Sequence, residues 1–169
     1  ITLWHRKFSH WLNRNTASRS RKNIRAHYDL GNELFRLFLD ESMTYSCGFF
    51  EDESSTLAQA QEAKLKMICS KLQLSRRDKI VEIGSGWGGF AIYAAKNYGC
   101  HITTTTISDE QYAHVKKRIA EEELTNNIAV MKKDYREMEG KFDKLVSVEM
   151  IEAGWNYAAS IQYHAGSTL

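Results

Sequence analysis

The sequence predicts an α/β fold in which helices flank a parallel sheet. Short β-branched or apolar runs at residues 79–83, 101–106, 128–131 and 142–150 predict four strands. Helical patterns separate the first three runs, and a glycine-rich turn at residues 84–89 joins the first run to the helix behind it. Strands that alternate with helices form parallel sheets, because each helix carries the chain back to the same edge.

The two helices between these strands carry signals at their ends. Gly99 follows the helical pattern that begins at the glycine turn, and glycine is a common C-terminal stop. Ser108 precedes the second helix, with Gln111 three residues further on. This is the spacing of a capping box, so we expect the second helix to begin at Ser108.

Two more helices are predicted ahead of the sheet. Residues 29–40 have helical spacing, and Asn32 could cap that helix at its start. Residues 43–50 then form an apolar and aromatic stretch that we expect to be extended or looped. The second helix is predicted from Thr56 to about Leu74. Its apolar stripe consists of Leu57, Leu65, Ile68 and Leu72.

The N-terminal segment is strongly basic. Residues 1–27 hold seven of the 23 basic residues and none of the 21 acidic ones, so the rest of the chain is net negative. Four apolar residues of this segment share one helical face flanked by basic residues: Trp4, Phe8, Trp11 and Leu12. That pattern fits a helix in an anionic lipid headgroup layer, and equally a helix packed against a larger protein. Nucleic-acid binding would need a recognition fold behind the basic patch, which the sequence does not show.

Length and composition indicate one ordinary globular domain. The 169 residues are 43% hydrophobic and 26% charged, and no apolar run is long enough to span a membrane. No signal peptide is visible, which favours a cytoplasmic protein. Cys47, Cys69 and Cys100 match no metal-binding spacing, so we expect no metal site and three reduced thiols. We expect Cys47 to pack as a small buried hydrophobe.

The glycine-rich turn is the strongest sign of a ligand. Glu82 precedes four glycines within six positions, and so many glycines cost chain entropy unless the turn has a purpose. The second strand ends in Thr103–Thr106 without the acidic residue that binds a dinucleotide ribose, and no P-loop lysine follows the glycines. The pattern E-x-G-x-G-x-G is instead typical of S-adenosylmethionine methyltransferases.

A series of short motifs runs in order through residues 14–153. They lie at residues 27–32, 38–40, 43–47, 56–57, 60–61 with Lys64, 82–89, 106–111, 134–136 and 142–152. Together these motifs resemble the cyclopropane-fatty-acid synthases and their relatives, the mycolic-acid cyclopropane synthases. A match in order over this length is far more specific than one glycine motif.

The resemblance implies an activity. These enzymes transfer a methyl or methylene group from S-adenosylmethionine to the cis double bond of an unsaturated phospholipid acyl chain. A bound bicarbonate ion then takes a proton from the resulting carbocation. The implied protein is a cytoplasmic enzyme that binds the anionic phospholipid membrane surface peripherally, does not bind nucleic acid, and possibly forms a homodimer.

The resemblance also implies roles for particular residues. The residues implied to bind the cofactor are Tyr45, Ser46, Gly84, Gly86, Thr106, Gln111, Asp134 and Tyr135. The implied catalytic residues are Cys47, through its backbone, and Glu152, through its carboxylate, and both would hold the bicarbonate. We prefer Glu152 to Glu149 because the family pattern places its acid at position 152.

The resemblance divides the chain into three parts. Residues 1–55 form a helical segment that covers lipid and cofactor, residues 56–153 the first half of the core, and residues 154–169 a divergent tail. The expected fold class is a Rossmann-like S-adenosylmethionine methyltransferase sheet flanked by helices, truncated at the C-terminus. We expect its last strand to be an exposed edge, and the chain to be weakly stable and catalytically poor. Two alternatives stay open: an inactive lipid- or cofactor-binding fragment, and a small-molecule methyltransferase on the same fold.

Overall fold

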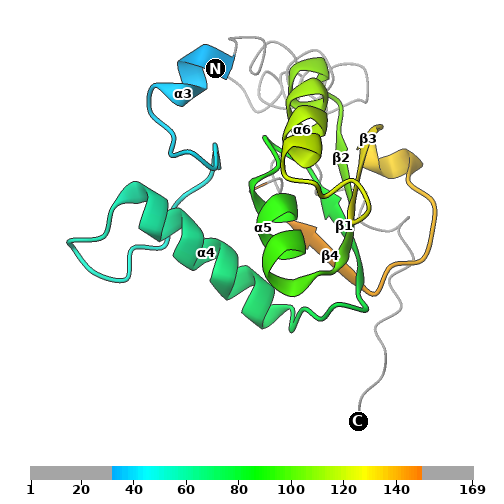
Figure 1. Cartoon of the computed structure of the whole chain (residues 1–169), viewed down its shortest axis with the longest axis horizontal. Helices are drawn as coiled ribbons and strands as arrows, with labels where there is room; N and C mark the ends of the chain where they lie inside the picture. The colour runs from blue at the N-terminus through cyan, green and yellow to red at the C-terminus, as the bar shows by residue number, and fades with distance from the viewer. Residues whose placement is uncertain (1–31, 150–169) are drawn as a thin grey trace, which may run out of the picture.

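The computed structural model describes residues 32–149, which form a parallel sheet with helices packed on it (Figure 1). The sheet has the strand order β3-β2-β1-β4. Its strands are β1 (Lys79–Ile83), β2 (His101–Thr106), β3 (Ile128–Lys132) and β4 (Lys144–Ser147). All three neighbouring pairs are parallel, which confirms the predicted α/β class.

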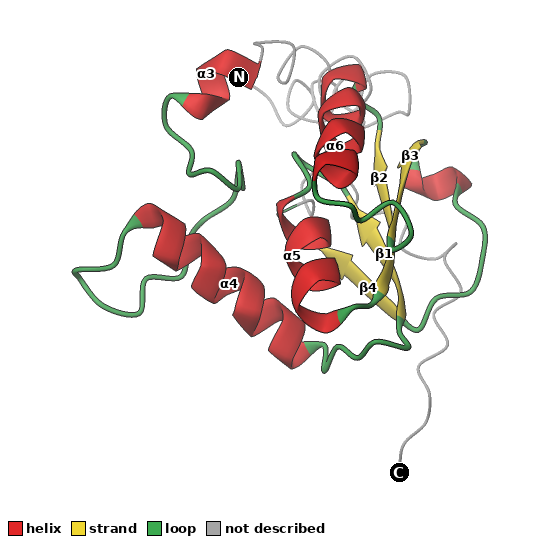
Figure 2. Cartoon of the chain, viewed as in Figure 1, coloured by secondary structure: helices red, strands yellow, loops and turns green. Residues whose placement is uncertain are grey.

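The helices lie before and between the strands. They are α3 (Asn32–Arg36), α4 (Leu57–Lys71), α5 (Gly89–Tyr98) and α6 (Asp109–Glu121), with a short 3-10 helix at Tyr135–Glu137. Figure 2 shows α4, α5 and α6 on the same side of the sheet. Among residues 32–149, no helix is long and apolar enough to cross a membrane.

The main hydrophobic core lies between the sheet and these helices. It joins Ile80 and Ile102 of the sheet to Ala91 and Ala95 of α5 and Val115 of α6. Cys69 and Cys100 are buried in the same core, and all three cysteines are free. Burial raises the pKa of the Cys69 thiol to about 12, so this cysteine packs as a neutral apolar group.

The predicted helix ends agree with the structure in α4, α5 and α6. Thr56 forms a complete capping box with Gln59 at the start of α4. Gly99 ends α5 with a φ of 67°, in the left-handed region where glycine is favoured. Ser108 caps α6 by accepting a hydrogen bond from Gln111 N. The side chain of Gln111 does not complete the box, because its Oε1 accepts a hydrogen bond from Thr106 instead.

Three predicted elements differ from the structure. The helix predicted at 29–40 ends at Arg36, and the turns that follow lead to Asp40, which accepts hydrogen bonds from the backbone N–H and the hydroxyl of Ser42. The fourth strand covers residues 144–147 instead of 142–150. The predicted stripe of α4 is wrong at Leu57, which is 37% exposed.

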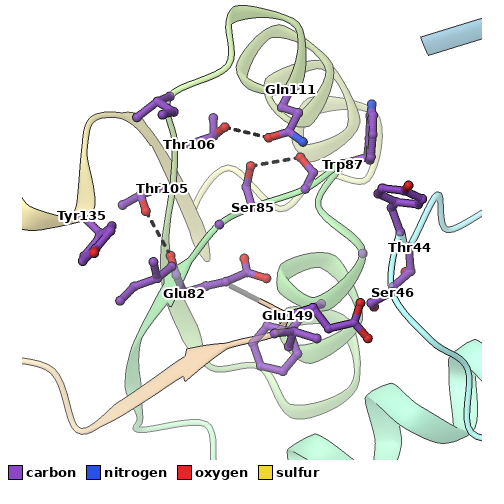
Figure 3. A pocket seen from close by; sticks show the side chains of 18 of the residues that line it. Thr44, Ser46, Glu82, Ser85, Trp87, Thr105, Thr106, Gln111, Tyr135 and Glu149 are labelled. Atoms are coloured by element: carbon purple, nitrogen blue, oxygen red, sulfur yellow. Dashed lines mark hydrogen bonds between the residues drawn. The ribbon is translucent and has the colours of Figure 1, made fainter. Parts of the chain in front are cut away.

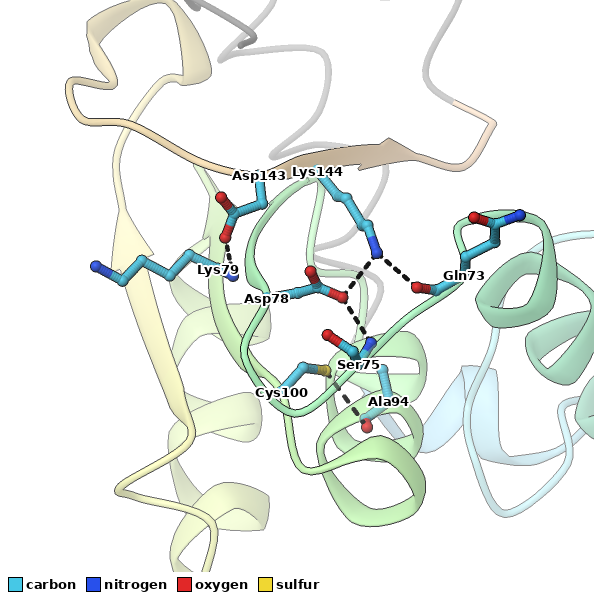
Figure 4. Close-up of polar contacts among 8 residues, drawn as sticks. All are labelled: Gln73, Ser75, Asp78, Lys79, Ala94, Cys100, Asp143 and Lys144. Atoms are coloured by element: carbon cyan, nitrogen blue, oxygen red, sulfur yellow. Dashed lines mark hydrogen bonds and ion pairs between the residues drawn. The ribbon is translucent and has the colours of Figure 1, made fainter. Parts of the chain in front are cut away.

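Polar contacts attach β4 to the turn that precedes β1 (Figure 4). Lys144 Nζ donates to the carbonyl of Gln73 at 2.6 Å and to Asp78 Oδ2 at 2.7 Å. The backbone N–H of Lys79 donates to Asp143 Oδ2 at 2.8 Å. These contacts fix the amino end of β4 and so help to set the position of its carboxyl end.

A second, smaller cluster joins α3 to the glycine turn. Phe35, Met43 and Trp87 are buried together, and the rings of Phe35 and Trp87 lie 4.4 Å apart between centroids. Tyr45 contacts Phe35 edge-on at 5.3 Å. This cluster therefore holds the segment before α4 against the end of the sheet. The predicted helix with the face of Trp4, Phe8, Trp11 and Leu12 lies outside the described residues, and so does the tail at 154–169.

Candidate functional site

A cavity of about 340 Å³ lies at the carboxyl ends of the strands (Figure 3). Small-molecule sites in proteins measure roughly 300–1,000 Å³, so the cavity suits one small ligand. The chain leaves β1 for β2 on one side and places β4 on the other, which makes the gap between β1 and β4 a topological switch point. Ligands of open α/β sheets bind at this point.

The floor of the cavity is the glycine turn. The backbone N–H groups of Gly84 and Ser85 donate to the carbonyl of Thr105, at 3.1 and 2.7 Å, which ties the turn to the end of β2. Gly86 has a φ of 49°, and a Cβ added there would contact nothing within 4 Å. The backbone at Gly86 is therefore open to a ligand. Gly89 and Phe90, at the start of α5, also line the cavity.

One wall is the covering segment, which we define as residues 42–47. Thr44, Tyr45 and Ser46 line the cavity from this side. Gln61 Nε2 on α4 donates to the carbonyls of Thr44 and Ser46, at 3.3 and 2.8 Å. The buried Lys64 donates from Nζ to the Ser46 hydroxyl. Helix α4 therefore holds the covering segment with two polar side chains.

Arg118 fixes the same wall from α6. Its Nη1 donates to the carbonyls of Ser42 and Trp87, each at 2.9 Å. One guanidinium group thus joins the covering segment to the glycine turn. Tyr45 is 44% exposed, so it is not a buried core residue.

The opposite wall comes from the ends of β2 and β3. The Thr106 hydroxyl donates to Gln111 Oε1 at 2.8 Å, and both side chains are buried. Asp134 is buried beside Tyr135, and its Oδ1 accepts a hydrogen bond of 2.8 Å from Arg136 Nε. Arg136 Nη2 also pairs with Asp134 Oδ2. Arg136 therefore keeps the Asp134 carboxylate fixed at the cavity wall.

Glu82 is a buried acid at the end of β1. Its side chain is 4% exposed, and Oε2 has no hydrogen-bond partner among the described residues. Burial raises the pKa of Glu82 to about 8, so the carboxyl group is largely protonated at neutral pH. Figure 3 shows it directed into the cavity. A cation bound beside Oε2 would favour the ionised form of this acid, so this place suits a cationic partner.

Glu149 lies across the cavity on the loop after β4. Its Oε1 accepts a hydrogen bond of 2.9 Å from the backbone N–H of Cys47. Partial burial acts to raise the pKa of Glu149, but hydrogen bonding from Cys47 and the positive charge of Lys64 outweigh it and lower the pKa. Glu149 is therefore ionised at neutral pH.

The structure brings the eight predicted cofactor residues together around this one cavity. Cys47 is exposed, so the expectation that it is buried was wrong, and it contacts the site through its backbone N–H. Glu152 lies outside the described residues. The side chains without a predicted role are Gln61, Lys64, Glu82, Arg118, Arg136 and Glu149. The only sequence signal for most of them was their place inside a matching motif.

The chain is similar to known lipid-modifying enzymes. It is 45% identical over 126 residues to the cyclopropane-fatty-acyl-phospholipid synthase of Escherichia coli K12, covering 75% of this chain and 32% of that protein. It is 40% identical over 131 residues to a probable fatty acid methyltransferase of Pseudomonas putida, covering 76% and 33%. The chain thus spans about a third of the length of the curated relatives it matches.

A solved structure agrees with this likeness. The mycolic acid cyclopropane synthase CmaA1, complexed with SAH and CTAB, superposes with a TM-score of 0.75 and 34% identity. The match covers 78% of this chain and 46% of that one, and it confirms the predicted methyltransferase-type sheet. The mycolic acid cyclopropane synthetase family matches residues 15–163. The chain therefore belongs to this family.

Proposed function

We propose that this chain is the cofactor-binding part of a methyltransferase that modifies the cis double bond of an unsaturated phospholipid acyl chain. The observation that supports it most is the gathering of the eight cofactor residues around one cavity of ligand size. When bound there, S-adenosylmethionine supplies an electrophilic methyl group. The protein needs mainly to position this donor and to exclude water.

The chemistry of the cavity wall fits S-adenosylmethionine. Its ammonium group suits Glu82, whose buried Oε2 has no partner among the described residues, and its carboxylate suits the amino end of α5 at Gly89. The open backbone at Gly86 permits close approach of the ligand. Tyr45 offers an aromatic edge near the covering segment, and Asp134 with Tyr135 offers polar and stacking contacts for an adenine.

Bicarbonate fits the described residues less well. The backbone N–H of Cys47, which the family resemblance assigns to that ion, already donates to the ionised Glu149. A bicarbonate ion bound there would have to displace Glu149 from this N–H. We therefore assign no step to bicarbonate in this chain.

The lipid substrate is proposed from the relatives. One relative is a cyclopropane-fatty-acyl-phospholipid synthase, and another is a tuberculostearic acid methyltransferase of Mycobacterium tuberculosis that is 39% identical over 145 residues. The solved relative bound CTAB, a detergent with a long alkyl chain, together with SAH. The basic residues at 1–27 support peripheral binding to anionic phospholipid from the cytoplasm. A homodimer remains part of the proposal.

Calorimetry with S-adenosylmethionine tests the cofactor assignment. We expect the chain to bind it, and the double variant Gly84→Asp, Gly86→Asp to lose binding, because two carboxylates would enter the cavity floor. The matched control is Thr125→Asp, Asn126→Asp, which adds the same charge at an exposed turn at the amino end of β3. A folded wild-type chain that does not bind, or equal binding by both double variants, would contradict the proposal.

Transfer of label tests the lipid half. Vesicles of unsaturated phosphatidylglycerol are incubated with the chain and S-adenosylmethionine carrying a tritiated methyl group, with fully saturated vesicles as the control. We expect label only in the unsaturated acyl chains. Label in a small water-soluble acceptor and none in lipid would favour a small-molecule methyltransferase instead.

A further inference from the structure

Helix α3 and the turn behind it expose large apolar side chains. Leu37 is 82% exposed, Phe38 51% and Leu34 40%, and we define these three side chains as the α3 surface. On the inner side of the same segment, Phe35 is 2% exposed and packs on Trp87. The core therefore uses only one of the two apolar sides of this segment. Exposed apolar side chains that lie together mark an interaction site.

Exposed apolar side chains are not spread evenly over the described part of the chain. Of the large ones among residues 32–149, only Met131, on β3, lies outside residues 34–57. Phe49 and Phe50 are exposed as well, but the acidic run 51–53 follows them directly and is also exposed. Carboxylates favour water over an apolar partner, so we leave this pair out of the α3 surface.

The α3 surface continues into the wall of the cavity. The ring of Phe38 lies 6.1 Å from the ring of Tyr45 between centroids, in an edge-on arrangement. Tyr45 lines the cavity and also contacts Phe35. Figure 1 shows α3 apart from the sheet, at the far end of the chain segment that leads to the cavity. Aromatic rings therefore connect the exposed surface to the edge of the cavity.

The proposed substrate gives this connection a purpose. A double bond within a phospholipid acyl chain lies in the hydrocarbon interior of a bilayer. The acyl chain must leave that interior to reach the cavity, and every methylene group that enters water raises the free energy. A protein surface that is apolar, touches the bilayer and adjoins the cavity removes this cost. The α3 surface has the last two properties if it lies on the bilayer.

The chain ahead of α3 supplies the attraction to an anionic bilayer. Residues 1–27 carry seven basic and no acidic side chains, and only residues 28–31 separate them from α3. Glu33 and Glu41 border the α3 surface and Arg36 lies within it, so the surface has little charge of its own. Basic residues next to exposed apolar ones are the usual combination in proteins that bind a bilayer surface.

We propose that the α3 surface inserts into an anionic phospholipid bilayer and leads an acyl chain past Tyr45 to the cavity. This inference rests on the proposed function for its substrate. The basic segment at 1–27 attracts the protein to the bilayer, and Leu34, Leu37 and Phe38 enter it. The two contributions respond differently to salt, because salt screens the attraction between charges and leaves the apolar contribution in place.

The variant Leu37→Ser tests the apolar contribution. A side chain that is 82% exposed adds little to the fold, so we expect an unchanged thermal midpoint and unchanged binding of S-adenosylhomocysteine. Met131→Ser is the matched control, because it removes an exposed apolar side chain from β3. Sedimentation with vesicles of dioleoyl phosphatidylglycerol measures binding at low and at high salt.

We expect Leu37→Ser to bind these vesicles about tenfold more weakly than wild type at both salt concentrations, because a leucine no longer leaves water. Met131→Ser should bind as wild type does. Equal binding by wild type and Leu37→Ser would overturn the proposal, since the basic segment alone would then account for the attraction.

A fluorophore reports insertion directly. Cys69 and Cys100 are buried, so in a Cys47→Ser background an added cysteine is the reactive thiol. An NBD group on Leu37→Cys should shift its emission to the blue in the presence of vesicles and be quenched by spin-labelled acyl chains. The same group on Met131→Cys should do neither. An NBD group on Leu37→Cys that stayed in water would contradict insertion.

A second copy of the chain is the other partner that an apolar surface can have. Sedimentation velocity without lipid would then show a wild-type dimer that Leu37→Ser separates, and both proteins would bind vesicles equally, which would overturn the proposal. Failure of the proposed function has a different signature. In that case the wild type would bind vesicles through Leu37 and still transfer no label from S-adenosylmethionine to unsaturated acyl chains.

Discussion

Glu82 shows how burial sets the chemistry of a single residue in this protein. It is buried at the end of β1, and its pKa rises from 4.5 to about 8. The folded chain therefore keeps a proton that the unfolded chain releases between these two pH values. The stabilising effect of this proton is complete below about pH 4.5 and disappears as pH rises through about 8.

The variant Glu82→Gln tests this linkage. We expect the free energy of unfolding of the wild type to fall between pH 5 and pH 8 by more than that of Glu82→Gln, which has no proton to lose. Urea unfolding at both pH values measures the difference. Glu139→Gln, at an exposed position, should keep the wild-type dependence. An identical dependence in wild type and Glu82→Gln would show that Glu82 is ionised in the fold.

The sequence predicted the residues that line the cavity better than it predicted the residues that hold the cavity wall in place. Glycines, a strand-end threonine and an aspartate are recognisable because they lie in short motifs next to strand ends. Gln61 and Lys64 lie on α4 among other polar residues, where they resemble a solvated face. Their burial depends on the covering segment folding back over α4, and a helical period contains no information about that contact.

The covering segment lies close against the start of α5. A Cβ at Gly89 would come too close to the Thr44 hydroxyl. Alanine favours a helix over glycine by about 1 kcal/mol, whereas overpacking costs about 1–3 kcal/mol. The clash should therefore outweigh the gain in helix propensity.

We expect Gly89→Ala to lower the thermal midpoint and to weaken binding of S-adenosylhomocysteine, because the covering segment must move. The double variant Gly89→Ala, Thr44→Ala should bind like Thr44→Ala alone, since removal of the hydroxyl relieves the clash. Calorimetry and thermal unfolding measure both effects. If Gly89→Ala alone bound the ligand as wild type does, the covering segment would not depend on this contact.

Elements with clear signals at their ends were predicted well, and elements whose apolar pattern continues past their ends were not. The strands at 79–83 and 101–106 have the predicted bounds, because β-branched runs between turn residues need no further information. The first helix ends at Arg36, four residues earlier than the helical pattern predicts, and turns follow it. The last strand is shorter than predicted because apolar residues continue past the paired ones.

At the scale of the whole molecule, the cavity lies between two apolar clusters. The main core supports the sheet, and the cluster of Phe35, Met43 and Trp87 supports the covering segment. Apart from the packing of Trp87, the contacts that link the covering segment to the sheet side of the cavity are polar. They are chiefly the hydrogen bonds of Arg118 and the hydrogen bond of Glu149 with Cys47. A ligand in the cavity would contact both the covering segment and the sheet, and would add to these contacts.

Hydrogen exchange with S-adenosylhomocysteine tests this coupling. If opening of the covering segment releases the ligand, saturation at 100 times Kd should slow exchange there by about 100-fold. We expect slower exchange both at residues 43–47 and at the glycine turn, 84–89. The turn at residues 125–127, at the amino end of β3, should exchange as before. Protection of the glycine turn alone would mean that the sheet binds the ligand without the covering segment, and that the two clusters act independently.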